Sequence, residues 1–252
     1  MSRAMAASAP TVLITGSARR IGRAIARDLA ANGWQVCVHY RRSAEDAEAL
    51  VEDIRRAGGS AVALAGDLAV EADVASLVPR CTEALGAPVC LINNASEFLV
   101  DTVATMAPET WDTHLDINLK APVFLAKSLF LALPPDAVGN VINIIDQRVW
   151  KLTPDFFSYT ISKAGLWTAT RTLAQALAPR VRVNAIGPGP VLKSIHQTEA
   201  DFAREAGSTL LKRGPTPEEI AVAVRFILAS PTLTGQMIAL DGGQHLTWSS
   251  EE

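Results

Sequence analysis

Two residues, Tyr159 and Lys163, have types and a spacing suited to proton transfer. They are four positions apart in the segment YTISK, and side chains at this spacing lie on the same face of a helix. A phenol has a pKa of about 10, and a nearby ammonium group that stabilises the phenolate helps it to exchange a proton near neutral pH. The pair predicts acid–base chemistry, although the same spacing also occurs as surface decoration of helices.

A third candidate, Asp146, stands thirteen residues before Tyr159 and ends the apolar segment NVINIID. An ionised carboxylate beside a carbonyl group under reduction would repel the developing alkoxide. A carboxyl group with a raised pKa could instead protonate a nitrogen atom. Asp146 therefore favours the reduction of a C=N bond.

The segment TGSARRIG follows the first apolar run and leads directly into a helical pattern. Gly16 allows a tight turn, and Gly22 lets the helix approach the strand closely. The helix start around Ile21 offers backbone N–H groups and a positive dipole to a pyrophosphate. Arg20 could contact phosphate or substrate, or could be a solvated arginine. The segment predicts a dinucleotide site.

The choice of cofactor depends on the segment HYRRS, which ends the second apolar run. A site that prefers NAD places Asp or Glu here for the ribose hydroxyls. Tyr40, Arg41, Arg42 and Ser43 supply no carboxylate, but they supply two guanidinium groups and a hydroxyl. They suit a 2′-phosphate and favour NADPH over NADH, the alternative being two arginines that are only solvated charge.

Seven apolar runs of strand length alternate with amphipathic segments of helical length, such as 21–33 and 43–59. The runs are 11–16, 34–40, 61–66, 88–94, 140–146, 181–187 and 236–243. This alternation predicts one α/β domain over residues 1–252, a doubly wound, Rossmann-like parallel sheet of about seven strands with helices on both faces. Residues 1–9 are expected to be disordered. The polar region 187–217 is expected to cover a substrate, the alternative being an insertion without a role.

Composition favours a small-molecule partner. The net charge of -3 gives no overall attraction for nucleic acid or an anionic membrane. No apolar run has the length of a signal peptide core or a membrane span, so we expect a cytoplasmic protein. Cys37, Cys81 and Cys90 lie in apolar segments, as free thiols usually do, which argues against a disulfide framework or a metal site.

Taken together, these segments resemble the short-chain dehydrogenase/reductase family. Its TGxxxGxG turn is matched except that Arg20 replaces the middle glycine, its NNAG motif is matched by NNAS, and its YxxxK pair is present. The resemblance implies that Asp67 and Leu68 border the adenine and that Asn118 in DINLKAP joins the catalytic residues. The expected cofactor-binding residues are Gly16, Arg20, Ile21, Gly22, Tyr40, Arg41, Arg42, Ser43, Asp67, Leu68, Asn94, Ala95, Ser96, Tyr159, Lys163, Pro188 and Gly189.

The sequence is most similar in pattern to the pteridine and dihydromonapterin reductases, which share the arginine-containing turn, the HYxRS-like segment, NNAS and the Asp–Tyr–Lys set. That resemblance implies hydride transfer from NADPH to a dihydropterin C=N carbon, with the nitrogen protonated through Asp146 and Tyr159. Lys163 would orient the nicotinamide ribose and lower the pKa of Tyr159, and Asn118 would hold a relay water. The implied substrate contacts are Arg20, Ser96, Phe98, Asp146 and Tyr159, with Phe98 stacked on the pterin unless it is ordinary core packing.

Two other functions stay open. The chain could reduce a carbonyl substrate such as a ketoacyl thioester, a sugar or another ketone, with Asp146 as a tolerated variation. It could also be a non-catalytic NADP(H) sensor, although the intact candidate residues count against this. The resemblance further implies a homo-tetramer, for which the apolar faces of helices 107–133 and 155–178 are the expected contacts.

Overall fold

The computed structural model describes residues 9–248, so the expectation of disorder for 1–9 falls, apart from Ala9, outside the described residues. Seven strands form the centre of the molecule. They are β1 Thr11–Ile14, β2 Gln35–Tyr40, β3 Ser60–Ala65, β4 Cys90–Asn93, β5 Gly139–Ile144, β6 Val181–Pro188 and β7 Met237–Leu240. The helices are α1 Arg20–Ala31, α2 Ala44–Arg56, α3 Glu71–Leu85, α4 Pro108–Leu115, α5 Ala121–Ala132, α6 Phe157–Leu177, α7 Glu199–Ser208 and α8 Pro217–Ala229.

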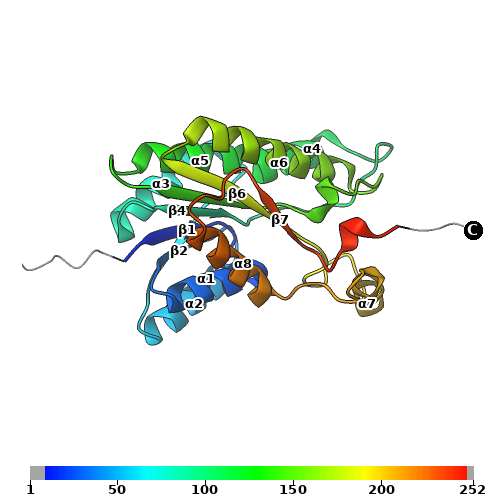
Figure 1. Ribbon diagram of the computed structural model, residues 1–252, viewed down its shortest axis with the longest axis horizontal. Helices are drawn as coiled ribbons and strands as arrows, with labels where there is room; N and C mark the ends of the chain where they lie inside the picture. The colour runs from blue at the N-terminus through cyan, green and yellow to red at the C-terminus, as the bar shows by residue number, and fades with distance from the viewer. Residues whose placement is uncertain (1–8, 249–252) are drawn as a thin grey trace, which may run out of the picture.

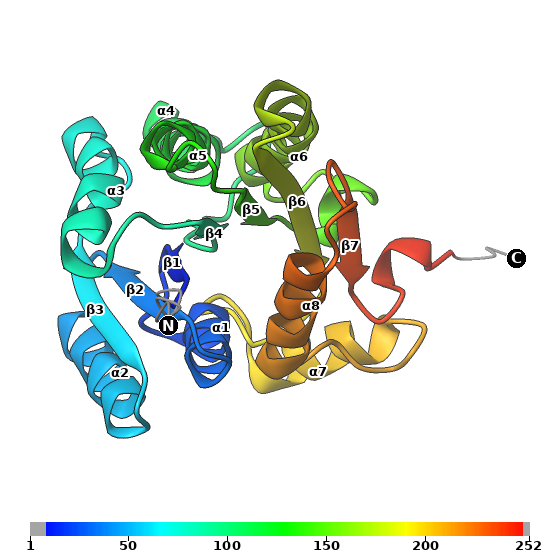
Figure 2. The same cartoon turned by 60° about the vertical axis from the view of Figure 1, so that its left-hand side comes forward.

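All strands are parallel, in the order β3-β2-β1-β4-β5-β6-β7. The chain therefore runs outward from β1 in one direction and returns to start again at β4 in the other (Figures 1 and 2). Ligands in such sheets bind at the carboxyl ends of the strands, where the order reverses. The predicted doubly wound, Rossmann-like sheet is confirmed.

Helices cover both faces of the sheet (Figure 1). One core is formed where α1, α2 and α8 pack on the sheet, around side chains such as Ile25, Leu50 and Val224. The other lies under α3, α5 and α6, around Leu77 and Leu125. Because apolar side chains are buried on both faces, the strands read as continuous apolar runs rather than alternating ones. The three cysteines lie buried in these cores as free thiols.

Two local features differ from the sequence-based expectation. The strand expected at 140–146 ends at Ile144, so Asp146 lies just beyond the strand. The polar region 187–217, for which the sequence analysis named no helix, contains α7. Thr198 and Asp201 form a capping box at the start of this helix. The spacing of these two residues is the signal that could have predicted it.

The helix expected over 107–133 is divided by a π-helical turn, Asp116–Lys120, between α4 and α5. Such turns insert an extra residue into a helix and occur often at functional sites. Asn118 lies in this turn and is buried. Within the part of the chain that the structure describes, no helix has the length and apolar character needed to span a membrane.

Gly22 allows α1 to approach the ends of β1 and β4. A Cβ atom at this position would lie 2.6 Å from Asn94 Nδ2 and 2.6 Å from the Gly16 carbonyl oxygen. We therefore expect Gly22→Ala to lower the free energy of unfolding by about 1–3 kcal/mol, measured by urea denaturation, because backbone must move to admit the methyl group.

Gly207 in α7 is the matched control, since a Cβ atom there would meet nothing within 4 Å. Gly207→Ala should raise the free energy of unfolding by up to about 1 kcal/mol through helix propensity alone. Equal effects of the two substitutions would contradict the close approach at Gly22.

Candidate active site

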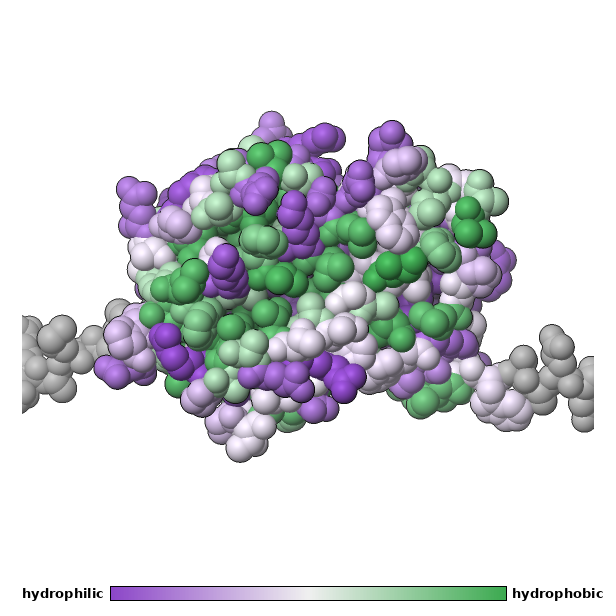
Figure 3. Space-filling model, turned by 90° about the horizontal axis from the view of Figure 1, so that it is seen from above, coloured by the Kyte–Doolittle hydropathy of each residue, from purple (hydrophilic) through white to green (hydrophobic). Residues whose placement is uncertain are grey.

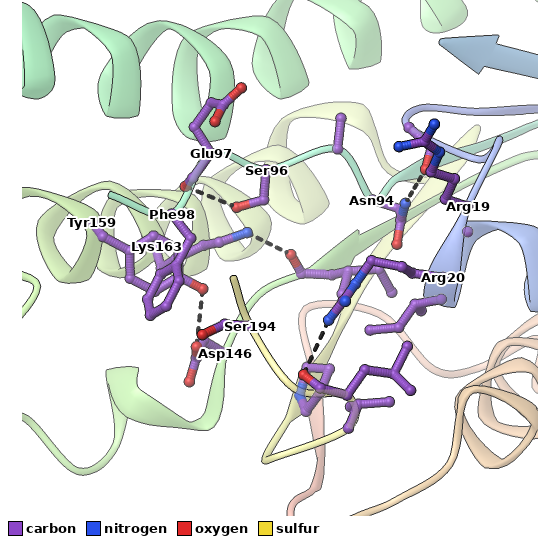
Figure 4. Close-up of a pocket in the computed structure, with 18 of the residues that line it drawn as sticks. Arg19, Arg20, Asn94, Ser96, Glu97, Phe98, Asp146, Tyr159, Lys163 and Ser194 are labelled. Atoms are coloured by element: carbon purple, nitrogen blue, oxygen red, sulfur yellow. Dashed lines mark hydrogen bonds between the residues drawn. The ribbon is translucent and has the colours of Figure 1, made fainter. Parts of the chain in front are cut away.

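A cavity of about 720 Å³ opens at the carboxyl ends of the strands. Every residue predicted from the sequence to bind cofactor or substrate lines this cavity, including Phe98 and Asp146. Figure 4 shows how several of these side chains, among them Arg20, Tyr159 and Lys163, come together there from different elements. Asn118 alone among the predicted residues does not line it. The shared location is thus established, while the individual roles stay predictions.

The glycine turn is held to the end of β4 by a set of hydrogen bonds. The Thr15 hydroxyl accepts from the backbone N–H groups of Asn94 and Ala95, both at 3.0 Å. The Asn94 side-chain amide donates to the carbonyl oxygens of Thr15 (2.9 Å) and Gly16 (3.0 Å). Gly16 has a φ of 61° and no room for a Cβ atom against Ala95. Asn94 therefore shapes the phosphate-binding turn through its side chain.

His39, which the sequence analysis did not select, fixes the same turn from the end of β2. Its Nδ1 accepts from the Gly16 N–H at 3.0 Å, and its Nε2 lies 3.1 Å from the Gly66 carbonyl oxygen. A neutral ring with the proton on Nε2 satisfies both contacts. The side chain is buried, and burial lowers the pKa of His39 to about 4. His39 is a polar residue within an apolar segment of strand length, and this was the signal from which its role in holding the turn could have been predicted.

Arg20 reaches across the mouth of the cavity. Its Nη1 donates to the Lys193 carbonyl oxygen and its Nη2 to the Leu192 carbonyl oxygen, both at 3.0 Å. Its backbone φ is 54°, the left-handed conformation that glycine adopts without strain. Arg20 thus adopts a backbone conformation that favours glycine while it carries a guanidinium group.

The two arginines expected at the 2′-phosphate have different surroundings. Arg41 forms an ion pair with Glu97, with Nη2 and Oε1 2.6 Å apart. Arg42 forms no ion pair with any residue in the range 9–248 and is exposed. Ser43 follows them and precedes α2. The group freest to meet an added phosphate is therefore Arg42.

The candidate catalytic side chains Asp146 and Tyr159 are in direct contact. The Tyr159 hydroxyl donates to Asp146 Oδ2 at 2.9 Å (Figure 4). The Arg148 N–H donates to Asp146 Oδ1 at 2.8 Å. Burial raises the pKa of Asp146, against the opposing effect of the Arg148 N–H and guanidinium. Protonation of a substrate nitrogen requires a carboxyl group with a raised pKa, and Asp146 has one in the structure.

Lys163 does not lower the pKa of Tyr159 in the way we expected. The pKa of Tyr159 is raised well above its ordinary value, first by burial and then by the negative charge and hydrogen bond of Asp146. Lys163 Nζ lies 5.7 Å from the centre of the Tyr159 ring and donates to the Ile144 carbonyl oxygen at 3.0 Å. Burial lowers the pKa of Lys163 to about 8. The group in direct contact with the phenol oxygen is therefore the Asp146 carboxyl group rather than the Lys163 ammonium.

The side chain of Asn118 cannot hold the expected relay water. Its Oδ1 accepts from the Ser96 hydroxyl (3.1 Å) and the Glu97 N–H (2.9 Å), while its Nδ2 donates to the Glu97 carbonyl oxygen (3.0 Å) and the Ser162 hydroxyl (3.1 Å). These four bonds use the whole hydrogen-bonding capacity of the amide. The Asn118 side chain ties the segment after β4 to α6, and a part of Asn118 in a water relay stays a prediction that would have to involve its backbone.

Phe98 stacks on a partner that the sequence analysis missed. Its ring centre lies 4.3 Å from that of Phe156 at an interplanar angle of 16°, and its ring meets Tyr159 edge-on at 4.7 Å. Phe156 has a φ of 55° immediately before α6. Both aromatic rings line the cavity, so Phe98 is not simply a core residue.

A buried polar cluster supports this aromatic group from behind. Ser158 Oγ donates to an Asp101 carboxylate oxygen and lies 2.6 Å from His114 Nδ1, and His114 Nε2 accepts from the Leu99 N–H at 3.0 Å. All three polar side chains are almost fully buried. The cluster joins the segment that carries Phe98 to the first turn of α6. It was missed because its members are far apart in the sequence.

Comparison with known proteins defines the class. The family described as enoyl-(acyl carrier protein) reductase matches residues 16–245, and the chain belongs to the short-chain dehydrogenase/reductase family of oxidoreductases. A 3-oxoacyl-[acyl-carrier-protein] reductase of Synechocystis sp. is 32% identical over 243 residues, which cover 94% of this chain and 98% of the relative. A putative ketoacyl reductase of granaticin polyketide synthesis from Streptomyces violaceoruber is 32% identical over 248 residues, covering 96% and 98%.

Two proteins of known structure share more of their sequence with this chain than the relatives named above do. FolM alternative dihydrofolate reductase 1 from Brucella suis, in complex with NADP, is 51% identical, with a TM-score of 0.93 and 98% of both chains covered. The Brucella canis protein of the same name, also complexed with NADP, is 50% identical, with a TM-score of 0.94 and 96% of both chains covered.

His39 predicts a pH-dependent stability. Because its pKa is lowered from 6.5 to about 4, the unfolded chain binds a proton that the folded chain excludes as the pH falls between these values. The stability contributed by the neutral ring is complete above pH 6.5 and is lost progressively towards pH 4, by about 3 kcal/mol at most. Urea denaturation at a series of pH values across this window should show the loss.

His39→Asn, which keeps an acceptor for the Gly16 N–H, should be less stable at neutral pH but should lose less stability on acidification. His196, which is exposed, provides the matched control, and His196→Asn should keep the wild-type pH dependence. A His39→Asn curve parallel to that of the wild type would contradict the assignment.

Proposed function

We propose that this chain is an NADPH-dependent reductase of the C=N bond of a dihydropterin, acting in the cytoplasm. The observation that carries the proposal is the contact between Asp146 and Tyr159. Burial favours the protonated form of this carboxyl group, and a neutral acid can protonate a nitrogen atom. The likeness to the FolM alternative dihydrofolate reductases of Brucella supports the same chemistry.

The residues present fit NADPH. The start of α1 has no side-chain cap, so its first backbone N–H groups are available to a pyrophosphate. Gly16 provides the close backbone approach, and Arg42 with Ser43 would hold the 2′-phosphate. Lys163 would orient the nicotinamide ribose. When bound, NADPH supplies the hydride for the reduction.

Asp146 and Tyr159 would move the proton. Asp146 Oδ1 accepts from a backbone N–H, which favours placing the acid proton on Oδ2. Oδ2 is also the oxygen in contact with the Tyr159 hydroxyl, so the hydrogen bond from Tyr159 would stabilise the carboxylate left on Asp146 once its proton has moved to the substrate nitrogen. Phe98 would stack on the pterin ring, while Arg20 and Ser96 would bind its polar edge. The region 187–217 would close over the substrate.

A second candidate function is the reduction of a ketoacyl thioester. It is favoured by the similarity of the chain to 3-oxoacyl-[acyl-carrier-protein] reductases and a putative ketoacyl reductase. Against it stands Asp146, whose carboxylate would oppose the negative charge that develops on a carbonyl oxygen. The two candidates therefore differ in what Asp146 should do.

The direct test is NADPH oxidation with purified enzyme. We expect turnover of at least one of dihydromonapterin, dihydrobiopterin and dihydrofolate, and much slower turnover of an acetoacetyl thioester. Absence of turnover with every pterin would overturn the proposal, and cofactor binding without any turnover on a broad panel would favour a sensor.

Asp146→Ser separates the two reductase functions. Removing the acid should lower pterin turnover about a hundredfold or more, whereas a ketoacyl reductase should keep or improve its activity. Asp155 lies in the same loop but is exposed and outside the cavity, so Asp155→Ser is the matched control and should retain pterin turnover.

We also propose that the chain assembles into a homo-tetramer. Exposed apolar side chains occur on two separate surfaces, with Phe124 and Leu131 on α5 and with Val222 and Phe226 on α8. Figure 3 looks onto the side where α5 and α6 lie in Figure 1 and shows hydrophobic residues gathered there. A closed tetramer with two-fold axes requires more than one self-complementary surface.

Light scattering after size-exclusion chromatography should give the mass of four chains. Phe124→Asp and Phe226→Asp should each reduce the assembly to a dimer by charging one surface, and the double variant should be monomeric. A monomeric wild type would contradict the proposed assembly.

A further inference from the structure

The cavity has a second end, opposite the arginines expected at the 2′-phosphate. Arg42 follows β2, near one edge of the sheet, whereas Gln244 follows β7, the strand at the other edge. Gln244 lines the cavity together with Gln197 and Glu205, which belong to the region after β6. Asp146 follows β5, so this wall lies beyond the candidate reacting groups. A substrate held at Asp146 would extend its side chain towards this wall.

Glu205 is held in the wall by two neutral amides. Its Oε2 accepts from Gln197 Nε2 at 2.6 Å, and its Oε1 accepts from Gln244 Nε2 at 3.2 Å. Gln197 is fixed in turn, because its Oε1 accepts from the Ser194 N–H at 3.1 Å. Glu205 lies on α7, whose start is fixed by its capping box. The carboxylate therefore has a defined position at the cavity wall and is only partly exposed.

The negative charge of Glu205 is not neutralised. Glu205 forms no ion pair within residues 9–248, and amide donors orient a carboxylate without cancelling its charge. The cations near this end do not contact Glu205. Lys193 forms an ion pair with Glu199 at 2.9 Å, while Lys151 Nζ donates to the Thr247 carbonyl oxygen at 2.9 Å and the Arg148 guanidinium lies over the Phe156 ring at 5.2 Å.

We propose that Glu205 determines substrate specificity by charge. This inference rests on the proposed pterin reduction and concerns the side chain of the pterin. The carboxylate accepts hydrogen bonds from a neutral, hydroxyl-bearing side chain, which strengthens binding because such bonds are charge-assisted. It repels a side chain that carries its own carboxylates, and this repulsion is little screened inside a cavity. Glu205 therefore selects polyhydroxylated pterins against those with an anionic tail.

The experiment compares kcat/KM for dihydromonapterin, whose side chain is neutral and hydroxylated, with that for dihydrofolate, whose tail carries two carboxylates. Glu205→Gln keeps the size and hydrogen-bonding ability of the side chain but removes the charge. We expect it to raise kcat/KM for dihydrofolate about tenfold, the effect of a single unfavourable charge contact. It should also lower kcat/KM for dihydromonapterin, by about threefold or more.

The change should appear mainly in KM, because Glu205 does not touch the reacting atoms. The affinity for NADPH should stay the same, since the cofactor arginines lie at the other end of the cavity. Glu205→Ala, which removes both the charge and the amide contacts, should also favour dihydrofolate. Glu199 lies on the same helix but is exposed, pairs with Lys193 and is outside the cavity, so Glu199→Gln should leave the preference unchanged.

The outcomes separate the two proposals. If the wild type reduces none of dihydromonapterin, dihydrobiopterin and dihydrofolate, the proposed function fails and this inference falls with it. If the wild type reduces a pterin but Glu205→Gln leaves the ratio of the two kcat/KM values unchanged, the charge selection is overturned while the proposed function stands. An equal shift in Glu199→Gln would also overturn it, because the effect would then come from net charge rather than from the cavity wall.

Discussion

The turn after β1 has to bring backbone N–H groups to a ligand, and three neighbouring strand ends meet to hold it there. Thr15 binds the end of β4, Asn94 donates back to the turn, and His39 at the end of β2 accepts from the Gly16 N–H. This seam lies where the strand order reverses, so its bonds join both halves of the sheet. The cavity, and with it the positions of Tyr159 and Asp146, follows from that closure.

The sequence predicted the fold because its signals are local and repeated. Each strand is buried on both faces and therefore appears as a short apolar run, and each glycine after a helix marks the end of that helix. The candidate site was also predictable in part, since Tyr159 and Lys163 share one helix and the turn at Gly16 follows a strand. Every residue predicted to bind cofactor or substrate lines the cavity.

The remaining features of the site could not be predicted from the sequence, because they depend on contacts between segments that are distant along the chain. The sequence could not show that the Asn118 side chain bonds to Ser96, Glu97 and Ser162, because these residues lie far from it along the chain. The pKa of Tyr159 was expected to follow Lys163, but it follows burial and Asp146. Electrostatic balance is set by distances in space, which spacing along the chain does not give.

Arg20 shows how the site and the stability of the fold oppose each other. A side chain in the left-handed backbone region costs about 1–2 kcal/mol relative to glycine, so the guanidinium at the cavity mouth is present at the expense of the turn that carries it. Replacing Arg20 by the glycine usual in the family would relieve that strain. Laboratory evolution that selects only for heat resistance will therefore tend to discard this arginine, and selection must include ligand binding if the residue is to persist.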